Sequence, residues 1–292
     1  MIRMLPDGRR LHLNDGPIDL IIGADGERRH VAAAHEAAAR RFISILDELC
    51  SELRLLRAQV TENSVRPSGA VARRMHAAVS PYGQKCFITL MAAVAGAVAE
   101  TVLEAMLAAA PLDRAHVNNG GDIALHIAEG MSYKVGMVER PDRPCLFGSF
   151  EVSADLPVRG IATSGWRGRS FSLGIADAVT VLAETASAAD AAATVIANAV
   201  DLPGQPAVTR IAAQEISPDS DLGNLLVTRG VRPLAMGEIE SAVDAGVQVA
   251  EQLRELRLIH SAALCLQGYT RTVADPSEQA CLKVEQRSLL HA

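Results

Sequence analysis

Lysine and aromatic residues are scarce in this chain of 292 residues, and both shortages limit the chemistry that it can carry. Aromatic residues make up 3% of the sequence although 49% of it is hydrophobic, so the core must consist mainly of Ala, Val, Leu and Ile. Lys85, Lys134 and Lys283 are the only lysines, which leaves three candidates for Schiff-base chemistry. The other basic side chains are arginines, which suit bidentate contacts with phosphate or carboxylate.

Cysteine pairs and a secretory segment are also missing. Five cysteines, at positions 50, 86, 145, 265 and 281, form neither a CxxC pair nor a Cys/His cluster. This fits a reducing compartment and speaks against a structural zinc site. The formal charge of −6 argues against a general nucleic-acid or anionic-membrane surface. Residues 1–20 contain no apolar run of the kind that a signal peptide needs. We therefore expect a cytoplasmic protein with no nucleic-acid or membrane partner.

Apolar periodicity predicts the elements of the N-terminal half. Alternating residues with two turn signals predict a β-hairpin at residues 10–30, and spaced apolar residues predict an amphipathic helix at 31–59. Residues 61–81 are interpreted as a polar, arginine-bearing loop. The stretch 87–110 predicts a buried helix rather than a membrane span, because Glu100 and Glu104 interrupt its apolar sequence.

The remaining pattern indicates an α+β fold. After the long helix and a short hinge, strand-like runs follow at 123–128, 132–139, 145–152, 158–163 and 178–183, and a helix follows at about 187–200. Strand, helix and strand recur at about 207–216, 236–256 and 257–273. Strands in a meander, interrupted by helices of this length, are typical of α+β proteins. Because no linker divides the chain, we expect a single domain over 1–292, with a hairpin and helix in 1–60, a motif-bearing core in 88–200 and a C-terminal part in 205–275.

The segment from Asn118 to Ile123 is the first that could carry chemistry. Gly120 and Gly121 let the backbone adopt positive φ and approach a ligand closely. Asp122 adds a carboxylate, and Asn118 and Asn119 add amide groups. The simpler interpretation is a tight turn between helix and strand, since Asn and Gly are common turn residues.

A second candidate segment is the end of the apolar run near residue 163. Thr163, Ser164 and Gly165 could form a cradle for phosphate or acyl oxygen, with Arg167 and Arg169 adding charge. Trp166 could stack on a planar ligand. An ordinary strand end followed by a solvated basic loop explains the same residues. No GxSxG pattern accompanies Ser164, so a serine nucleophile is less favoured.

The helix at about 187–200 and the small-residue helix before it complete the candidates. Asp190 and Thr194 lie one turn apart, and their oxygens would suit a hard cation such as Mg²⁺. The alternative is that Ser187 caps the helix and Asp190 completes a capping box, which local sequence favours. The run of small residues around Ala95 and Gly96 permits close approach by a ligand or, more commonly, by another helix.

Four segments, in their order along the chain, resemble the ApbE-like superfamily. They are the small-residue helix at 91–100, the Gly-Gly-Asp turn, the Ala-Thr-Ser-Gly strand end and the Asp190–Thr194 helix. The superfamily's best-known members are Mg²⁺-dependent flavin transferases, which move FMN from FAD onto a Thr of a partner protein. The resemblance covers roughly residues 88–200 and implies an α+β fold of mainly antiparallel sheets with packed helices and two related halves. The chain is most similar to a cytoplasmic branch rather than to the true transferases.

The resemblance assigns roles to residues. Asp190 and Thr194 match the metal-binding residues, and a backbone carbonyl near residues 94–96 would be the third ligand. The turn residues Asn119, Gly120, Gly121 and Asp122 would lie beside the nucleotide, and Thr163, Ser164 and Gly165 would lie beside the flavin. Mg²⁺ and FAD or FMN are therefore the implied ligands.

Two departures weaken the expectation of flavin transfer. Ala95 stands where transferases carry a Lys, and residues 172–177 lack the His and Pro of the His-x-x-Asp-Pro segment. A proton-transfer group and a basic cofactor contact are thus missing. Asp122 or Asp177 becomes the candidate general base. Arg66, Arg73 and Arg74 could close over phosphates from the preceding loop, and a solvated basic loop explains the same residues.

We therefore expect a protein that binds a phosphorylated or flavin-like heteroaromatic ligand with Mg²⁺ and catalyses a transfer or hydrolysis reaction. Two alternatives remain open, namely a non-catalytic cofactor-binding or assembly protein and a retained FAD:protein FMN transferase. The sequence is also compatible with a homodimer.

Overall fold

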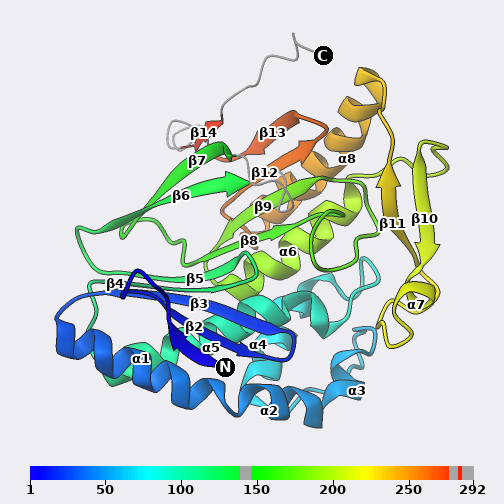
Figure 1. The fold of residues 1–292 in the computed structure, drawn as a ribbon. Helices are drawn as coiled ribbons and strands as arrows, with labels where there is room; N and C mark the ends of the chain where they lie inside the picture. The colour runs from blue at the N-terminus through cyan, green and yellow to red at the C-terminus, as the bar shows by residue number, and fades with distance from the viewer. Residues whose placement is uncertain (139–145, 276–281, 285–292) are drawn as a thin grey trace. The chain divides into compact units, whose positions relative to one another are not determined.

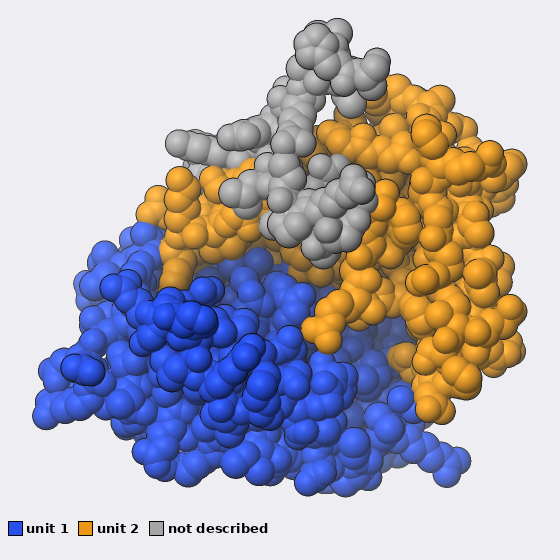
Figure 2. All heavy atoms as spheres, in the orientation of Figure 1, with its two compact units in different colours: residues 1–132, 153–162, 183–191 blue, residues 133–152, 163–182, 192–292 orange. Residues whose placement is uncertain are grey.

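The computed structural model describes residues 1–138, 146–275 and 282–284 (Figure 1). The chain forms two compact units (Figure 2). Unit 1 contains residues 1–132, 153–162 and 183–191, and unit 2 contains residues 133–152, 163–182 and 192–292. Both units combine antiparallel strands with helices, which confirms the expected α+β class. The expectation of a single domain over 1–292 stays a prediction.

An antiparallel sheet is the centre of unit 1. Its strands pair in the order β1 (Ile2–Met4), β2 (Leu11–Asp15), β3 (Ile18–Asp25), β4 (Arg114–Asn119) and β5 (Asp122–Ile127), and β5 pairs with the first residues of β8 (Gly160–Ser164). Leu13 lies opposite Leu20 and both are fully buried, so the alternating apolar residues of this hairpin form one buried face. The predicted hairpin at residues 10–30 is confirmed.

Strand β4 corrects the expectation of a hinge between helix and strand before residue 118. In this strand Ala115, Val117 and Asn119 are buried, whereas the alternate residues are partly exposed. The alternation has the period of a half-buried strand. Arg114, His116 and Asn118 are polar, as in many loops, so the sequence did not reveal the alternation of a strand.

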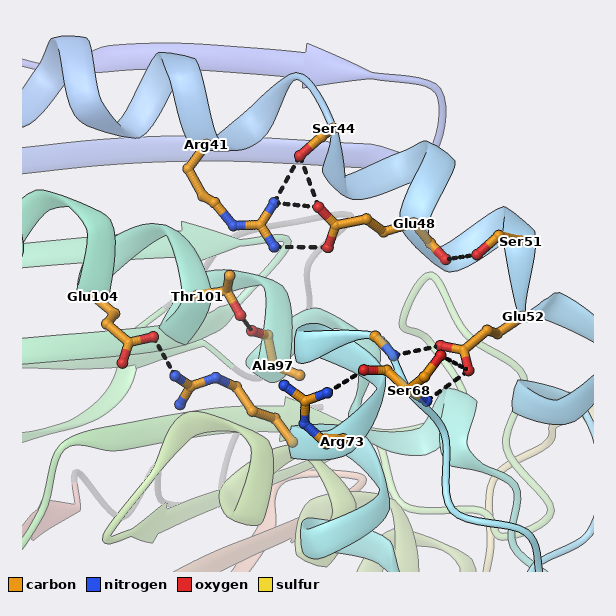
Figure 3. Close-up of polar contacts among 12 residues, drawn as sticks. Arg41, Ser44, Glu48, Ser51, Glu52, Ser68, Arg73, Ala97, Thr101 and Glu104 are labelled. Carbon is orange, nitrogen blue, oxygen red and sulfur yellow. Dashed lines mark hydrogen bonds and ion pairs between the residues drawn. The ribbon is translucent and has the colours of Figure 1, made fainter.

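Three helices replace the single helix predicted for residues 31–59. They are α1 (Arg28–Phe42), α2 (Ile45–Ser51) and α3 (Leu53–Leu56). The backbone departs from helical values at Glu52, where φ is −115° and ψ is 13°. At the junction of α1 and α2, Arg41 donates to both Ser44 and Glu48, and Ser44 donates to Glu48 (Figure 3). These bonds join side chains across the junction between the two helices.

Helix α4 (Ala70–Val79) lies where the sequence suggested only a polar loop at 61–81, so that prediction was wrong. The helix begins after Gly69, which has no side chain to cap it. The Glu52 carboxylate accepts hydrogen bonds from the backbone N–H groups of Ser68, at 2.7 Å, and Gly69, at 2.8 Å (Figure 3). Because this cap comes from a residue 17 positions away, the local sequence does not announce the helix. A short 3₁₀ turn, η1 (Ser80–Tyr82), follows it.

The long helix is confirmed as α5 (Val94–Ala109), preceded by the 3₁₀ turn η2 (Leu90–Ala93). α5 packs against α1, α4, β4 and β5, and its residues Ala97, Val98, Val102 and Met106 are fully buried. Within the described part of the chain, Leu90–Ala109 is the one stretch long and apolar enough to cross a membrane by length and composition alone. Its packing against four elements of unit 1 agrees with the expected buried helix.

Unit 2 contains further antiparallel pairs. β12 (Ser261–Leu266) pairs with β9 (Ala178–Ala183) and with β13 (Tyr269–Val273), and α8 (Met236–Glu255) packs against β12 and β13. β10 (Val208–Ala212) pairs with β11 (Leu226–Val231), and β7 (Leu146–Ser153) lies between β6 (Ser132–Val138) and β14 (Leu282–Val284). The strand expected at 207–216 ends at residue 212 and continues as α7 (Ala213–Ile216), and β11 was not foreseen. Helix α6 (Ala186–Ala199) begins in unit 1 and continues into unit 2.

Candidate functional site

The Gly-Gly-Asp segment is the turn of the β4–β5 hairpin. Asn119 and Asp122 are paired, so the loop consists of Gly120 and Gly121, whose φ angles are +69° and +119°. Two-residue hairpin loops favour such positive φ values. The Asn118 side-chain oxygen accepts a hydrogen bond from the Gly121 N–H at 2.8 Å. A Cβ atom on Gly121 would meet nothing within 4 Å, so the backbone conformation rather than crowding requires glycine there. Ligand binding by Gly120 and Gly121 stays a prediction.

Asn119 joins this turn to the start of α5. Its side-chain amide donates to the backbone carbonyl of Ala95 at 3.2 Å, and the residue is 7% exposed. The expected third metal ligand was a carbonyl in residues 94–96, so this contact brings two of the candidate positions together within unit 1.

Asp190 reaches the same helix end from α6. Its Oδ2 atom accepts a hydrogen bond from the Gly96 N–H at 3.0 Å, and the Ala95 N–H bonds to the same carboxylate. The residue before α5, Ala93, offers no side-chain cap, so Asp190 supplies one from a distant part of the sequence. The favoured alternative, in which Asp190 completes a capping box for its own helix, was wrong. At the start of α6 the Thr185 hydroxyl accepts the Ala188 N–H instead, at 3.2 Å.

Asp190 is partly buried, and other negative groups lie near its carboxyl group. Burial and the nearby charge of Asp122 raise the pKa of Asp190 well above its ordinary value, while the bonds from Gly96 and Ala95 oppose the rise and Glu100 adds slightly to it. Two carboxyl groups close together in a low dielectric cannot both ionise without a counter-charge. The pKa shift of Asp190 therefore indicates that a proton or a nearby positive charge is favoured at this carboxyl group.

Gly96 allows α5 and α6 to approach each other closely. A Cβ atom at this position would lie 2.3 Å from the Ala186 carbonyl oxygen and 2.7 Å from the Ser187 nitrogen. These are backbone atoms of α6, so no rotamer change could relieve the overlap. Close helix packing therefore explains the small residue at this position, as the commoner interpretation predicted.

Glu100 is a member of this cluster that the sequence did not reveal. Its Oε1 atom accepts a hydrogen bond from the Ser187 N–H at 2.6 Å, and its Oε2 atom accepts one from Arg74 at 3.3 Å. The side chain is 12% exposed. A carboxylate within a largely apolar helix, a feature that Glu104 shares, was the one signal that could have marked it.

The arginines expected to close over phosphates have other partners. Arg74 pairs with Glu100 and with Glu104, both on α5. Arg73 donates to the Ser68 carbonyl near the start of its own helix (Figure 3). Both side chains thus have partners within unit 1, and phosphate binding by Arg66, Arg73 and Arg74 stays a prediction.

A second polar cluster surrounds Asp177 in unit 2. Oδ1 of Asp177 accepts hydrogen bonds from Trp166 Nε1, at 3.1 Å, and Arg167 Nε, at 2.6 Å, and Oδ2 accepts the Gln267 N–H at 2.6 Å. The Arg167 guanidinium also lies 4.2 Å from the centre of the Trp166 ring. Three donors thus occupy a side chain that is 4% exposed. This geometry suits an anchor for Trp166 and Arg167, and the role of general base at Asp177 stays a prediction.

The remaining candidates in unit 2 have separate surroundings. The hydroxyl groups of Thr163 and Thr180 are hydrogen-bonded at 2.9 Å. Gly165 is buried, and Ser164 ends strand β8. Thr194 follows Asp190 by one turn on α6. Their predicted roles in binding flavin and metal stay predictions.

Comparisons with known proteins identify relatives of the chain. A family model described as AbpE bacteria matches residues 2–272. A UPF0280 protein of Methanopyrus kandleri is 38% identical over 184 residues, which cover 62% of this chain and 69% of that protein. UPF0280 proteins of Methanothrix thermoacetophila and Methanocella arvoryzae are 34% and 38% identical over 150 and 131 residues. These two matches cover 51% and 44% of this chain and only 60% and 50% of those relatives.

Solved structures show a weaker likeness. The flavinyl transferase ApbE of Pseudomonas stutzeri is 11% identical, with 96% of each chain covered and a TM-score of 0.48. The ApbE protein of Thermotoga maritima is 14% identical, with a TM-score of 0.46. No property of this chain follows from likenesses at that level. The family match over residues 2–272 is sufficient by itself, and the chain belongs to the ApbE-like family described as AbpE bacteria.

Proposed function

We propose that this protein binds Mg²⁺ together with a phosphorylated, flavin-like ligand at the Asp122–Asp190 cluster and catalyses a transfer or hydrolysis reaction on that ligand. The partly buried Asp190 carboxyl group, near the charge of Asp122, is the observation that carries the proposal. Its pKa is raised by burial and by the charge of Asp122, so a cation placed beside it would remove an electrostatic penalty.

The residues present fit a magnesium ion that shares its coordination with a ligand. Asp122, Asp190, the Asn119 amide oxygen and the Ala95 carbonyl are hard oxygen donors within unit 1. In residues 1–138, 146–275 and 282–284, no group of three or more His, Cys, Asp or Glu side chains is arranged to hold a metal. Mg²⁺ is commonly bound by one or two carboxylates together with water and substrate phosphates. Two carboxylates therefore suffice for a metal that arrives with a phosphorylated ligand.

Each part of the cluster has a task in this proposal. Asp122 and Asp190 would hold the cation. The open space beside Gly121 would let a phosphate approach the hairpin turn, where Gly120 and Gly121 expose backbone. When bound, Mg²⁺ would neutralise charge on the phosphates. The Asp190–Gly96 hydrogen bond keeps the carboxylate oriented before any ligand arrives.

Thermal unfolding with and without Mg²⁺ and FAD tests the binding. A ligand at one hundred times its Kd adds about 2.7 kcal/mol of stability, which corresponds to a rise in Tm of about 5–10 °C for a domain of roughly this size. We expect such a rise for the wild-type protein and none for Asp190→Asn. Asp155→Asn, which changes an exposed carboxylate of unit 1, is the matched control and should keep the rise.

For the metal-free protein, we expect Asp190→Asn to raise the thermal stability. The folded state raises the pKa of Asp190, so ionisation destabilises the fold as the pH rises above the ordinary carboxyl pKa. Asp190→Asn should therefore unfold at a higher temperature than the wild type in metal-free buffer at pH 7. A variant that is less stable at pH 7 and still shows the Mg²⁺-linked rise would refute the assignment of Asp190.

Incubation with FAD, Mg²⁺ and a Thr-containing acceptor separates the possible activities. Covalent flavin on the acceptor with release of AMP would identify FMN transfer, and AMP without covalent flavin would identify hydrolysis. Stoichiometric binding without either product would favour a non-catalytic cofactor-binding protein. Absence of any shift with Mg²⁺ or FAD would contradict the proposal.

A further inference from the structure

Three helices of unit 1 begin at carboxylates that belong to other elements. Glu52 accepts the N–H groups before α4, Asp190 accepts those at the start of α5, and Glu100 accepts one at the start of α6. Unsatisfied N–H groups at a helix start carry partial positive charge, and a carboxylate there both satisfies and neutralises them.

The caps of α5 and α6 are reciprocal. Asp190 extends from α6 to the start of α5, and Glu100 extends from α5 to the start of α6. The two hydrogen bonds, at 3.0 and 2.6 Å, are donated by the N–H groups of Gly96 and Ser187, which also take part in the close contact between the two helices. The position of each helix start is thus determined by a side chain of the other helix.

We propose that Glu100 is a positioning residue that orients Asp190 for cation binding. Glu100 acts by fixing the first turn of α6, and Asp190 follows that turn on the same helix. This inference rests on the proposed function, because it explains how the Asp122–Asp190 cluster is held in place.

Arg74 reinforces the arrangement from α4. Its guanidinium pairs with Oε2 of Glu100 while Oε1 accepts the Ser187 N–H, so both carboxylate oxygens have fixed directions. Glu104, one turn further along α5, pairs with the same arginine but is 68% exposed and has no bond to α6. Glu104 therefore provides a matched control in which an Arg74 ion pair is lost and the α6 cap is kept.

Binding of Mn²⁺ in place of Mg²⁺, followed by calorimetry, measures the effect on the cation. Loss of a residue that orients a metal ligand commonly weakens metal affinity by about 10–100-fold. We expect Glu100→Ala to weaken Mn²⁺ binding within that range, whereas Glu104→Ala should leave it unchanged. Glu100→Gln retains an oxygen acceptor for the Ser187 N–H and should restore most of the affinity.

Hydrogen exchange of the metal-free protein gives a second, independent readout. Glu100→Ala should speed exchange at Ser187, which loses its acceptor, and also at Gly96, whose acceptor is Asp190. If Glu100 only capped α6, its loss would change the rate of hydrogen exchange at Ser187 alone. Faster exchange at Ser187, with exchange at Gly96 and Mn²⁺ affinity both unchanged, would overturn the positioning role.

The two proposals fail in distinguishable ways. If the wild-type protein binds no Mn²⁺, alone or with FAD, the proposed function is refuted and the role of Glu100 in cation binding is refuted with it. If the wild type binds Mn²⁺ and Glu100→Ala binds it equally well, only the role of Glu100 fails. Folding of each variant is checked by far-UV circular dichroism, and Glu100→Gln covers the case in which Glu100→Ala does not fold.

Discussion

The substitution Gly96→Ala tests the close contact on which the candidate site depends. The added methyl group would lie 2.3 Å from the Ala186 carbonyl oxygen, 2.4 Å from its carbonyl carbon and 2.7 Å from the Ser187 nitrogen. All three atoms belong to the backbone of the first turn of α6. The helices can accommodate the methyl group only by moving apart, which would stretch the hydrogen bond from Gly96 to Asp190.

Overpacking and helix propensity have opposite effects on the free energy of unfolding of Gly96→Ala. Overpacking of a well-packed contact costs typically about 1–3 kcal/mol, and an overlap with backbone belongs at the upper end of that range. Replacing a helical glycine by alanine gains up to about 1 kcal/mol from helix propensity. We therefore expect a net loss of about 2 kcal/mol, which lowers Tm by about 4–8 °C in a domain of roughly this size.

Gly237→Ala is the matched control for this measurement. Gly237 lies in the first turn of α8, as Gly96 does in α5, but a Cβ atom there would meet nothing within 4 Å. This variant should be more stable than the wild type by up to about 1 kcal/mol. Thermal unfolding of the two variants decides the question. Equal effects of Gly96→Ala and Gly237→Ala would refute the close contact, as would a Gly96→Ala protein that is as stable as the wild type.

Two further substitutions test the caps and anchors that the structure contains. Glu52→Ala removes the acceptor for the N–H groups before α4 and should lower the free energy of unfolding by about 0.5–2 kcal/mol, as measured by chemical denaturation. Because the Ser68 N–H lowers the pKa of Glu52, this loss is present above the ordinary carboxyl pKa and disappears as the pH falls through the lowered value. Asp177→Asn places an amide opposite the Gln267 N–H and should cost about 1–3 kcal/mol. The emission of Trp166, the single tryptophan, should change with it, and an unaltered spectrum would contradict the anchoring role.

Sequence periodicity predicted the elements whose signal is local. The hairpin at residues 10–30, the long helix now seen as α5 and the helix α6 each have repeated apolar residues with turn or stop signals beside them. β-Branched and apolar runs also marked most strands between residues 123 and 183. In these places the local preference agrees with the tertiary structure, so a single sequence suffices.

The elements that sequence reasoning missed depend on distant partners. α4 begins after Gly69 and is capped by Glu52, so no helix-start residue is visible next to it. β4 alternates buried residues with Arg114, His116 and Asn118, which hydrogen-bonded neighbours in β3 and β5 hold in the sheet. Local sequence preferences depend on these polar residues and contain no information on the strands that pair with β4.

The candidate site depends on the same kind of distant contact. Ser187 and Asp190 have the spacing of a capping box, and local sequence cannot tell a carboxylate that caps its own helix from one that caps another. The structure makes the distinction, because the acceptor bonds of Asp190 go to Gly96 and Ala95, 94 and 95 positions earlier in the chain. A carboxylate used only as a cap would gain from being ionised there. The pKa of Asp190 is instead raised, because burial and Asp122 outweigh the two N–H groups. That imbalance is the physical reason to test whether Asp190 holds a proton or a cation there.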